Sequence, residues 1–407
     1  MKRVVIVGGS YAGLRALAQL AKEPELSITL IDRHPYHFLQ TEGYDLIAGR
    51  IPFDETIVGL RSLCAGFGER VRFVQAVAED VDFANRRLIC EGGELFDYDY
   101  LVIAAGAVTR FFENVSGLRS CSYGVKSLRA AFKLKQFFEE ELYKRLESAE
   151  DAQADFNILI GGAGLSGVEI AAEMQAFFNR YYRANALACG TIKIHLADKH
   201  FLKGLHPTVV RKSKTRLERL GVHLHIGAYI TKVAPNRAYL DNETSIPFDF
   251  MLFTGGIVAA PFVQRLDLPK NRLQQIVVDR TMRPEGIDNV FVVGDAAALF
   301  DRAGRPVPPT AQSAEVSGTI AGRNIVRLLH HETPLEGDIR LKGLAIALGG
   351  RYAIVDVGAF RIYGFLAYFG KKVIEKGYKW PLKWRAKRGF ATISHCKSKE
   401  VDHGQRA

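Results

Sequence analysis

Two glycine-rich turns contain the residues of this chain whose types and spacing predict chemistry. Each turn follows a short apolar run and precedes a helical pattern, a context in which glycines let the backbone approach a diphosphate. The first turn contains Gly8, Gly9, Ser10 and Gly13, and the second contains Gly162, Gly164 and Gly167. One such turn would be a weak sign, because any tight strand-to-helix connection can use glycine. Two of them, 154 residues apart, predict two dinucleotide sites and electron transfer between the dinucleotides.

An acidic residue follows each turn at the end of the next predicted strand. Asp32 lies 19 residues after Gly13, and Asp198 lies 31 residues after Gly167. A carboxylate there accepts hydrogen bonds from an adenosine ribose, while the diphosphate lies on the helix N-terminus. The second spacing exceeds the usual value of about 20, and a long helix near 168–183 accounts for the excess. Because an acid repels a 2′-phosphate, the second site is predicted to prefer NADH over NADPH.

Small residues and one further acid lie where three other predicted strands end. These residues are Ala105, Gly106, Gly255, Gly294 and Asp295. The small residues let the chain pass close to a ligand, and a carboxylate can hold a polyhydroxyl chain such as the ribityl group of a flavin. A helix that begins near Thr310, with Ala311 and Gln312 in its first turn, would direct its positive end at an anionic reduced flavin.

Together these segments resemble the two-dinucleotide-binding flavoproteins and, within them, the type II (non-proton-pumping) NADH dehydrogenases. The resemblance depends on GGSYAG, Asp32, AAG at 104–106, GGAGLSGVE, GDAA and PPTAQ, and spans about residues 1–385. It implies an α/β fold with two nested Rossmann-like domains. It also implies that the first site binds FAD, that the second binds NADH, and that electrons pass from NADH to a membrane quinone without proton pumping.

The same resemblance implies domain boundaries and two catalytic residues. The implied parts are an FAD-binding domain at 1–112 and 266–330, an NADH-binding domain at 113–265 and a membrane-associating region at 331–407. Glu169 matches a glutamate near the nicotinamide and the quinone, where a proton-delivering role and a plain ribose or surface role are both open. Gln312 matches the first Gln of the family's quinone-side motif AQxAxQ, whereas Val316 replaces the second Gln.

The cysteine positions help to distinguish which electron acceptor the flavin would use. Residues 33–60 contain no cysteine, which excludes the redox-active disulfide that related reductases carry after the first acid. Sulfide:quinone oxidoreductases need two cysteines beside the flavin, and Cys121 is a candidate for only one of them. Such an oxidoreductase and a redox-sensing flavoprotein that binds a partner therefore remain alternatives. The five cysteines show no metal-binding spacing, so no metal site is expected.

The basic charge of the chain is concentrated at its C-terminal end. Of the net charge of +11, the stretch from Arg361 onward contributes +9. Apolar residues recur there at helical spacing, with cations around them and two tryptophans after them. They are Ile362, Phe365, Leu366, Phe369 and Val373, then Lys371, Lys372 and Lys376, then Trp380 and Trp384. Aromatic and cationic side chains suit the lipid headgroup layer, so residues 361–390 predict membrane docking, with burial against the FAD domain as the alternative for the apolar part.

Further features of the sequence bear on partners and location. Pro381 is expected to break or restart the C-terminal helix. No nucleic-acid recognition fold accompanies the basic residues, and the oligomeric state stays open, a homodimer included. The longest uncharged run contains Thr, Gly and Pro, and the chain begins directly on a strand, so we expect neither a transmembrane helix nor a secretory signal. These features predict a peripheral protein on the cytoplasmic face of the cell membrane.

Overall fold

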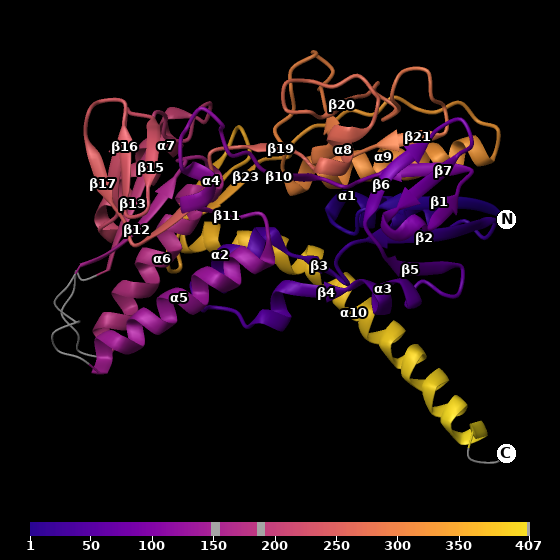
Figure 1. The fold of residues 1–407 in the computed structure, drawn as a ribbon, viewed down its shortest axis with the longest axis horizontal. Coiled ribbons are helices and arrows are strands. Elements are labelled where there is room, and N and C mark those ends of the chain that lie inside the picture. Colours follow the sequence, from indigo (N-terminus) through magenta and orange to yellow (C-terminus); the bar gives the residue numbers. More distant parts are fainter. Residues whose placement is uncertain (148–154, 185–191, 405–407) are drawn as a thin grey trace.

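The chain folds around two five-stranded parallel sheets, which lie side by side in Figure 1. The structure is a computed structural model that describes residues 1–147, 155–184 and 192–404. The first sheet has the order β5–β2–β1–β9–β21. Its strands are β1 (Lys2–Val7), β2 (Leu26–Asp32), β5 (Val71–Gln75), β9 (Tyr100–Ile103) and β21 (Val290–Val292). The chain leaves β1 toward one side and later returns to β9 on the other, so a ligand crevice opens beyond the carboxyl ends of these two strands.

The second sheet repeats this arrangement in the order β14–β13–β12–β18–β11. Its strands are β11 (Tyr123–Gly124), β12 (Phe156–Gly161), β13 (Ile192–Asp198), β14 (His223–Ile226) and β18 (Phe250–Phe253). Strand β12 corresponds to β1, and β18 corresponds to β9, so the second crevice opens between β12 and β18. The prediction of two nested doubly wound α/β units is confirmed.

Helices cover both sheets. The longer ones are α1 (Tyr11–Leu20), α5 (Leu128–Glu147), α6 (Leu165–Ala184), α7 (Pro207–Leu220) and α9 (Ala311–Leu329). The short ones are α2 (Gly43–Ile47), α3 (Leu60–Ala65), α4 (Leu118–Cys121) and α8 (Pro261–Arg265). Helices α1 and α9 pack so tightly that a Cβ atom at Gly318 would lie 2.1 Å from the Ala12 carbonyl oxygen. This contact brings α9 against the beginning of α1, next to the first glycine turn.

Short strands complete the two units and connect them. The antiparallel pair β10 (Ala107–Thr109) and β19 (Ile257–Ala259) lies where the chain passes between the two sheets. Antiparallel three-stranded sheets are formed by β6 (Ala78–Asp82), β7 (Arg87–Cys90) and β8 (Leu95–Asp97), and by β15 (Ile230–Ala234), β16 (Arg237–Leu240) and β17 (Ser245–Pro247). Two further pairs are β3 (Tyr36–Phe38) with β4 (Ile57–Gly59) and β20 (Ile276–Val277) with β22 (Ala297–Ala298).

The C-terminal region consists of a small sheet followed by one long helix. The sheet contains β23 (Leu344–Ala347), β24 (Ala353–Asp356) and β25 (Arg361–Gly364), and the helix is α10 (Phe365–Gly404). Figure 1 shows α10 running beneath both sheets, with its last turns projecting away from the body. Ile362 belongs to β25, so the apolar helical stripe predicted from residue 362 begins instead at Phe365.

The prediction that Pro381 breaks the helix is wrong, because α10 continues through it. Proline removes the hydrogen bond to the carbonyl group four residues earlier, which belongs to Gly377. Both Gly377 and Pro381 are exposed, so water can bond this carbonyl group. Within the described part of the chain, no helix combines the length and the apolar character needed to cross a membrane.

Candidate active site

The first glycine turn fits tightly beneath the end of β9. Gly8 has φ +109°, a backbone conformation that favours glycine, and a Cβ atom there would lie 2.3 Å from the Ala104 carbonyl oxygen. A Cβ atom at Gly13 would lie 1.9 Å from the Gly8 carbonyl oxygen. The turn therefore needs glycine at both positions, and it lies beside Ala104 and Ala105.

Asp32 stabilises this turn from the neighbouring strand. Its carboxylate accepts the N–H groups of Gly9 at 2.7 Å and His34 at 2.8 Å. Ser10 is the N-cap of α1, yet its side chain makes no capping hydrogen bond, so the first N–H groups of the helix have no side-chain partner. A helix N-terminus of this kind binds a diphosphate. The residues present fit the diphosphate and adenosine ribose of FAD.

The opposite end of the first crevice is formed by the segments after β21 and before α9. A Cβ atom at Gly294 would lie 3.0 Å from the Cβ atom of Ala12, so this segment touches α1. Asp295 is ion-paired with Lys126 at 2.5 Å, a partner that sequence spacing could not reveal. The helix N-cap is Thr310, which places Ala311 and Gln312 in the first turn of α9 as predicted.

The second glycine turn repeats the geometry of the first. Gly162 has φ +114°, and a Cβ atom at Gly167 would lie 1.9 Å from the Gly162 carbonyl oxygen. Asp198 accepts the Ala163 N–H at 2.8 Å, as Asp32 accepts the Gly9 N–H. A Cβ atom at Gly162 would also lie 2.8 Å from the backbone nitrogen of Gly255, which brings that segment against the turn.

Space for a ligand is visible at Gly164, where an added Cβ atom would meet no heavy atom within 4 Å. The open position lies where the diphosphate of a dinucleotide approaches this type of turn. Lys199, the cation beside Asp198, lies 3.8 Å from Asp241 and 5.6 Å from the ring centroid of Tyr229. Asp198 ends β13 beside the second glycine turn, where an acid suits an unphosphorylated ribose, so the residues fit NADH.

A cleft of about 1090 Å³ lies beside the β10–β19 connection and the start of α5. Lysine and arginine outnumber acids strongly along its walls. The cations are Arg33, Arg110, Arg119, Lys126, Arg129 and Lys133, and the one acid is Glu113. A concave surface with this imbalance attracts anions, and dinucleotides carry anionic diphosphates.

The two predicted catalytic residues lie at opposite ends of one segment. Glu169 on α6 accepts the Ala347 N–H at 2.9 Å, and Gln312 on α9 accepts the Lys342 N–H at 2.8 Å. The two donors lie five residues apart in the chain, a span of at most about 18 Å. Val316 packs against the core of the first domain, and its neighbour Glu315 is ion-paired with Arg15.

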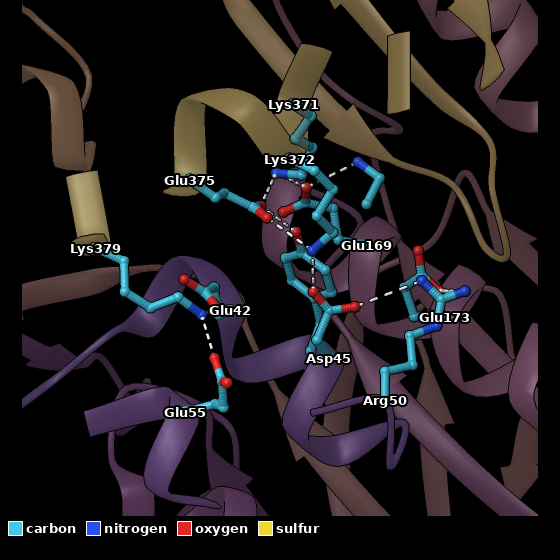
Figure 2. Close-up of polar contacts among 12 residues, drawn as sticks. Glu42, Asp45, Arg50, Glu55, Glu169, Glu173, Lys371, Lys372, Glu375 and Lys379 are labelled. Atoms are coloured by element: carbon cyan, nitrogen blue, oxygen red, sulfur yellow. Dashed lines mark hydrogen bonds and ion pairs between the residues drawn. The ribbon is translucent and has the colours of Figure 1, made fainter. Parts of the chain in front are cut away.

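Glu169 also belongs to a cluster of ion pairs that sequence reasoning did not find (Figure 2). We call it the α6–α10 cluster. Its members are Asp45, Arg50, Glu169, Glu173, Lys371, Lys372 and Glu375. Lys371 lies 3.1 Å from Glu169 and 3.3 Å from Glu375, and Lys372 pairs with Asp45 and Glu375. The one sequence signal was the second carboxylate of EIAAE, four residues after Glu169 and therefore on the same face of the helix.

The cluster corrects the predicted role of two lysines. Lys371 and Lys372 were expected to surround the membrane-facing stripe, but both face the body of the protein. Lys379 likewise pairs with Glu42 at 2.7 Å and Glu55 at 3.0 Å (Figure 2). The inner side of α10 is therefore cationic. Its lysines bind carboxylates of the two domains.

Burial and neighbouring cations shift the pKa values of the carboxyl groups in the cluster in opposite directions. Burial raises the pKa of Glu169, although Lys371 opposes the shift. Burial alone would also raise the pKa of Glu375, but the ammonium groups of Lys371 and Lys372 outweigh it and lower the pKa. Burial raises the pKa of Glu173 to about 7, against the opposing charge of Arg50. The raised pKa of Glu173 therefore lies near neutral pH.

Cys121, the candidate sulfur residue, ends α4 and is partly exposed. Cys64 and Cys90 lie in the core of the first domain, whereas Cys121 packs against a different apolar cluster. Burial raises the pKa of the Cys64 thiol to about 12 and that of Cys90 to about 11, which disfavours their reactive thiolate forms. Among the cysteine side chains that the structure describes, none is placed to act with Cys121.

Comparisons with known proteins agree with this geometry. The family model for pyridine nucleotide-disulphide oxidoreductases matches residues 2–318. The type II NADH:quinone oxidoreductase of Staphylococcus saprophyticus is 26% identical over 385 residues, covering 92% of this chain and 94% of that protein. The enzyme of the same name from Staphylococcus aureus is 27% identical over 390 residues, with the same coverage.

Two solved structures share the fold. NDH2 from Plasmodium falciparum, in complex with NADH, has a TM-score of 0.84 at 16% identity, and the match covers 97% of this chain and 98% of that one. The sulfide:quinone oxidoreductase of Aquifex aeolicus has a TM-score of 0.77 at 20% identity, with 95% and 92% covered. The chain contains two dinucleotide-type crevices, and the family model covers more than three quarters of its sequence. This chain therefore belongs to the pyridine nucleotide-disulphide oxidoreductase family.

Proposed function

We propose that this protein is an FAD-dependent enzyme that oxidises NADH and reduces a membrane quinone without pumping protons. The observation that carries the proposal is the repeated crevice, in which a glycine turn and an acid recur with the same contacts at Asp32 and Asp198. The chemistry that FAD supplies when bound is acceptance of a hydride and release of its electrons. The relatives named type II NADH:quinone oxidoreductase support quinone as the acceptor.

The residues of the chain would act mainly by binding and positioning. The turn at 8–13 and Asp32 would hold the adenosine diphosphate half of FAD, while Asp295 would hold the ribityl chain. Gly164 and Asp198 would hold NADH. Hydride transfer needs correct orientation and exclusion of water, and both are supplied by the shape of the two crevices. Glu169 and Gln312 are proposed to face the reacting groups from the two ends of the 342–347 segment.

We also propose the division 1–112, 113–265, 266–330 and 331–407. The position of the β10–β19 pair at 107–109 and 257–259 supports it. Peripheral attachment to the cytoplasmic face of the membrane is the corresponding proposal for the last part. The exposed apolar residues of α10 support it, among them Phe365, Leu366, Phe369, Trp380 and Trp384.

The function can be tested by adding NADH to the purified protein without oxygen and following the flavin absorbance. We expect rapid bleaching, followed by rapid return of the absorbance when a soluble quinone is added. Bleaching with no response to quinone would overturn the proposal in favour of a redox sensor. Bleaching by sulfide but not by NADH would favour sulfide oxidation instead.

A Cys121→Ser substitution is expected to leave NADH:quinone turnover within about twofold of the parent, because the side chain is partly exposed and similar in size. The measurement is steady-state reduction of quinone by NADH, with FAD content determined in parallel. In a sulfide:quinone oxidoreductase that used this cysteine, the substitution would abolish reduction of quinone by sulfide. Loss of activity at unchanged FAD content would therefore contradict the proposed function.

A further inference from the structure

One ion pair joins the two domains at the end of the first crevice where the ribityl chain of FAD is proposed to lie. Lys126 Nζ is 2.5 Å from Asp295 Oδ2, although the two residues are 169 positions apart in the chain. Asp295 follows β21 of the first domain, and Lys126 precedes α5 of the second. In the described contacts the other oxygen of Asp295, Oδ1, has no partner. It can therefore accept a ribityl hydroxyl group while Oδ2 keeps Lys126.

Contacts of the backbone hold both partners of this ion pair in place. The Asp295 carbonyl oxygen accepts the side-chain amide of Gln275 at 3.0 Å. The Lys126 carbonyl oxygen accepts the side-chain amide of Gln40 at 3.4 Å. The side chains of Lys126 and Asp295 are 24% and 16% exposed, so water screens their charges only in part. The fold therefore fixes an ammonium group at this end of the crevice.

Lys126 differs from the other cations of the large cleft that it also lines. The others are Arg33, Arg110, Arg119, Arg129 and Lys133. Three of them lie over aromatic rings: Arg110 over Phe112, Arg119 over Phe111 and Lys133 over Tyr123. Among the described contacts of these six side chains, only that of Lys126 reaches a residue predicted to bind FAD. Lys126 is therefore the cation that connects the cleft to the first crevice.

Hydride transfer changes the charge in this crevice. NADH gives up a hydride, which consists of two electrons and one proton, and becomes NAD⁺. The transfer adds one negative charge to the flavin, because no second proton accompanies the hydride. An opposite charge beside an ionisable group favours its charged form by about tenfold or more. A cation at the ribityl end of the crevice should favour the reduced flavin in the same way, together with the positive end of α9.

We propose that Lys126 raises the midpoint potential of the bound FAD, because its ammonium group stabilises the negative charge that hydride transfer adds. This inference rests on the proposed function, in which FAD occupies the first crevice. Asp295 then has two tasks, since one oxygen binds the ribityl chain and the other orients Lys126. Lys126 belongs to the part proposed to bind NADH, at 113–265. The domain that brings the hydride donor therefore also brings the charge that stabilises the reduced flavin.

The test is the midpoint potential of the FAD-loaded protein, measured by titration with dithionite in the presence of mediators and a reference dye. This measurement uses neither NADH nor quinone, so it reports on the bound flavin alone. Lys126→Met keeps the length of the side chain but removes its charge. The ratio of reduced to oxidised FAD at a fixed potential is expected to fall about tenfold in this variant. For a two-electron couple, this fall corresponds to a midpoint potential about 30 mV more negative.

Charge variants separate this role from a plain contact between domains. Lys126→Arg keeps the positive charge and should restore most of the parent potential. Asp295→Asn removes the negative charge and should shift the potential in the opposite direction, to more positive values. Lys135→Met is the matched control, because this lysine lies farther along α5 and pairs with Glu139 instead. Its potential should equal that of the parent.

The affinity for FAD gives a second readout that needs no turnover. By linkage, a residue that raises the potential binds reduced FAD more tightly than oxidised FAD by the same factor. In Lys126→Met, the affinity for reduced FAD should therefore fall about tenfold more than the affinity for oxidised FAD. The measurement is anaerobic ultrafiltration of both forms, with the released FAD read from its absorbance after reoxidation.

An unchanged potential in Lys126→Met would overturn the inference, as would equal shifts in the two Lys126 variants. Shifts of Lys126→Met and Asp295→Asn in the same direction would show that the pair only holds the domains together, and would overturn it too. If Asp295→Asn loses its FAD, the two Lys126 variants still decide the question. Failure of the proposed function gives a different pattern: NADH would not bleach the flavin, while the potentials of the variants would still differ as expected. A protein that binds no FAD would overturn both.

Discussion

A Gly167→Ala variant is expected to retain its FAD but to resist reduction by NADH. The added Cβ atom would lie 1.9 Å from the Gly162 carbonyl oxygen and 2.8 Å from the Thr254 hydroxyl oxygen. Because these atoms belong to the turn and to the segment facing it, the start of α6 or the turn must move. A displacement of about 1 Å at a dinucleotide site can lower kcat/KM about 100-fold. The first crevice contains none of these atoms, so FAD binding should survive.

The measurement is anaerobic flavin bleaching by NADH in stopped flow, with FAD content read from the absorbance spectrum. Gly13→Ala is the matched variant, since its Cβ atom would lie 1.9 Å from the Gly8 carbonyl oxygen. That variant should lose FAD itself. Gly377→Ala is the neutral control, because an added Cβ atom meets no heavy atom within 4 Å.

Gly164→Ala provides a more selective form of the same test. The position is open in the folded chain, so the substitution should leave the Tm unchanged. It should nevertheless weaken NADH binding, because a diphosphate must approach this backbone closely. Normal bleaching by NADH in both Gly164→Ala and Gly167→Ala would mean that NADH binds elsewhere.

The two dinucleotide crevices could be predicted from sequence because their determinants are local. A strand, a glycine turn and a helix are continuous in the chain, and the acids Asp32 and Asp198 end the next strand in each unit. The contacts of Gly8 and Gly162 explain why glycine is required there rather than merely tolerated. The start of α9 was predictable for a similar reason, since Thr310 and Ser313 form a capping box within four residues.

The α6–α10 cluster could not be predicted, because its members come from segments far apart in the chain. Lys371 is 202 residues from Glu169, and Lys372 is 327 residues from Asp45. In sequence, both lysines look like part of an amphipathic surface helix. Only the docking of α10 against α2 and α6 distinguishes its inner cations from its outer ones. The spacing of Glu169 and Glu173 hinted at paired carboxylates but not at their partners.

Replacing Leu366, Phe369 and Trp380 together by Gln is expected to release the protein from lipid vesicles. These side chains are 71%, 60% and 68% exposed, so the folded protein gains little from them. Burying each in the acyl boundary contributes about 1.5–3 kcal/mol. Loss of all three should lower vesicle binding by at least about 100-fold. The measurement is co-sedimentation with anionic vesicles, and a triple Leu95, Val277 and Phe300→Gln variant is the control, because these residues are exposed on other elements.

The same variant separates membrane attachment from catalysis. Its turnover with a quinone dissolved in the bilayer should fall with vesicle binding, while turnover with a water-soluble quinone should remain near that of the parent. The exposed Lys376, Lys387 and Arg388 remain on α10, and each contributes about 1 kcal/mol near an anionic surface. Residual binding should therefore be weak and should disappear as salt is raised.

Equal losses with both quinones would instead place these side chains in the acceptor site, whereas unchanged vesicle binding would assign the exposed face of α10 to another partner. Because Lys371 and Lys372 bind carboxylates of the body on the inner side of the same helix, attachment through the outer side would hold the α6–α10 cluster close to the membrane surface.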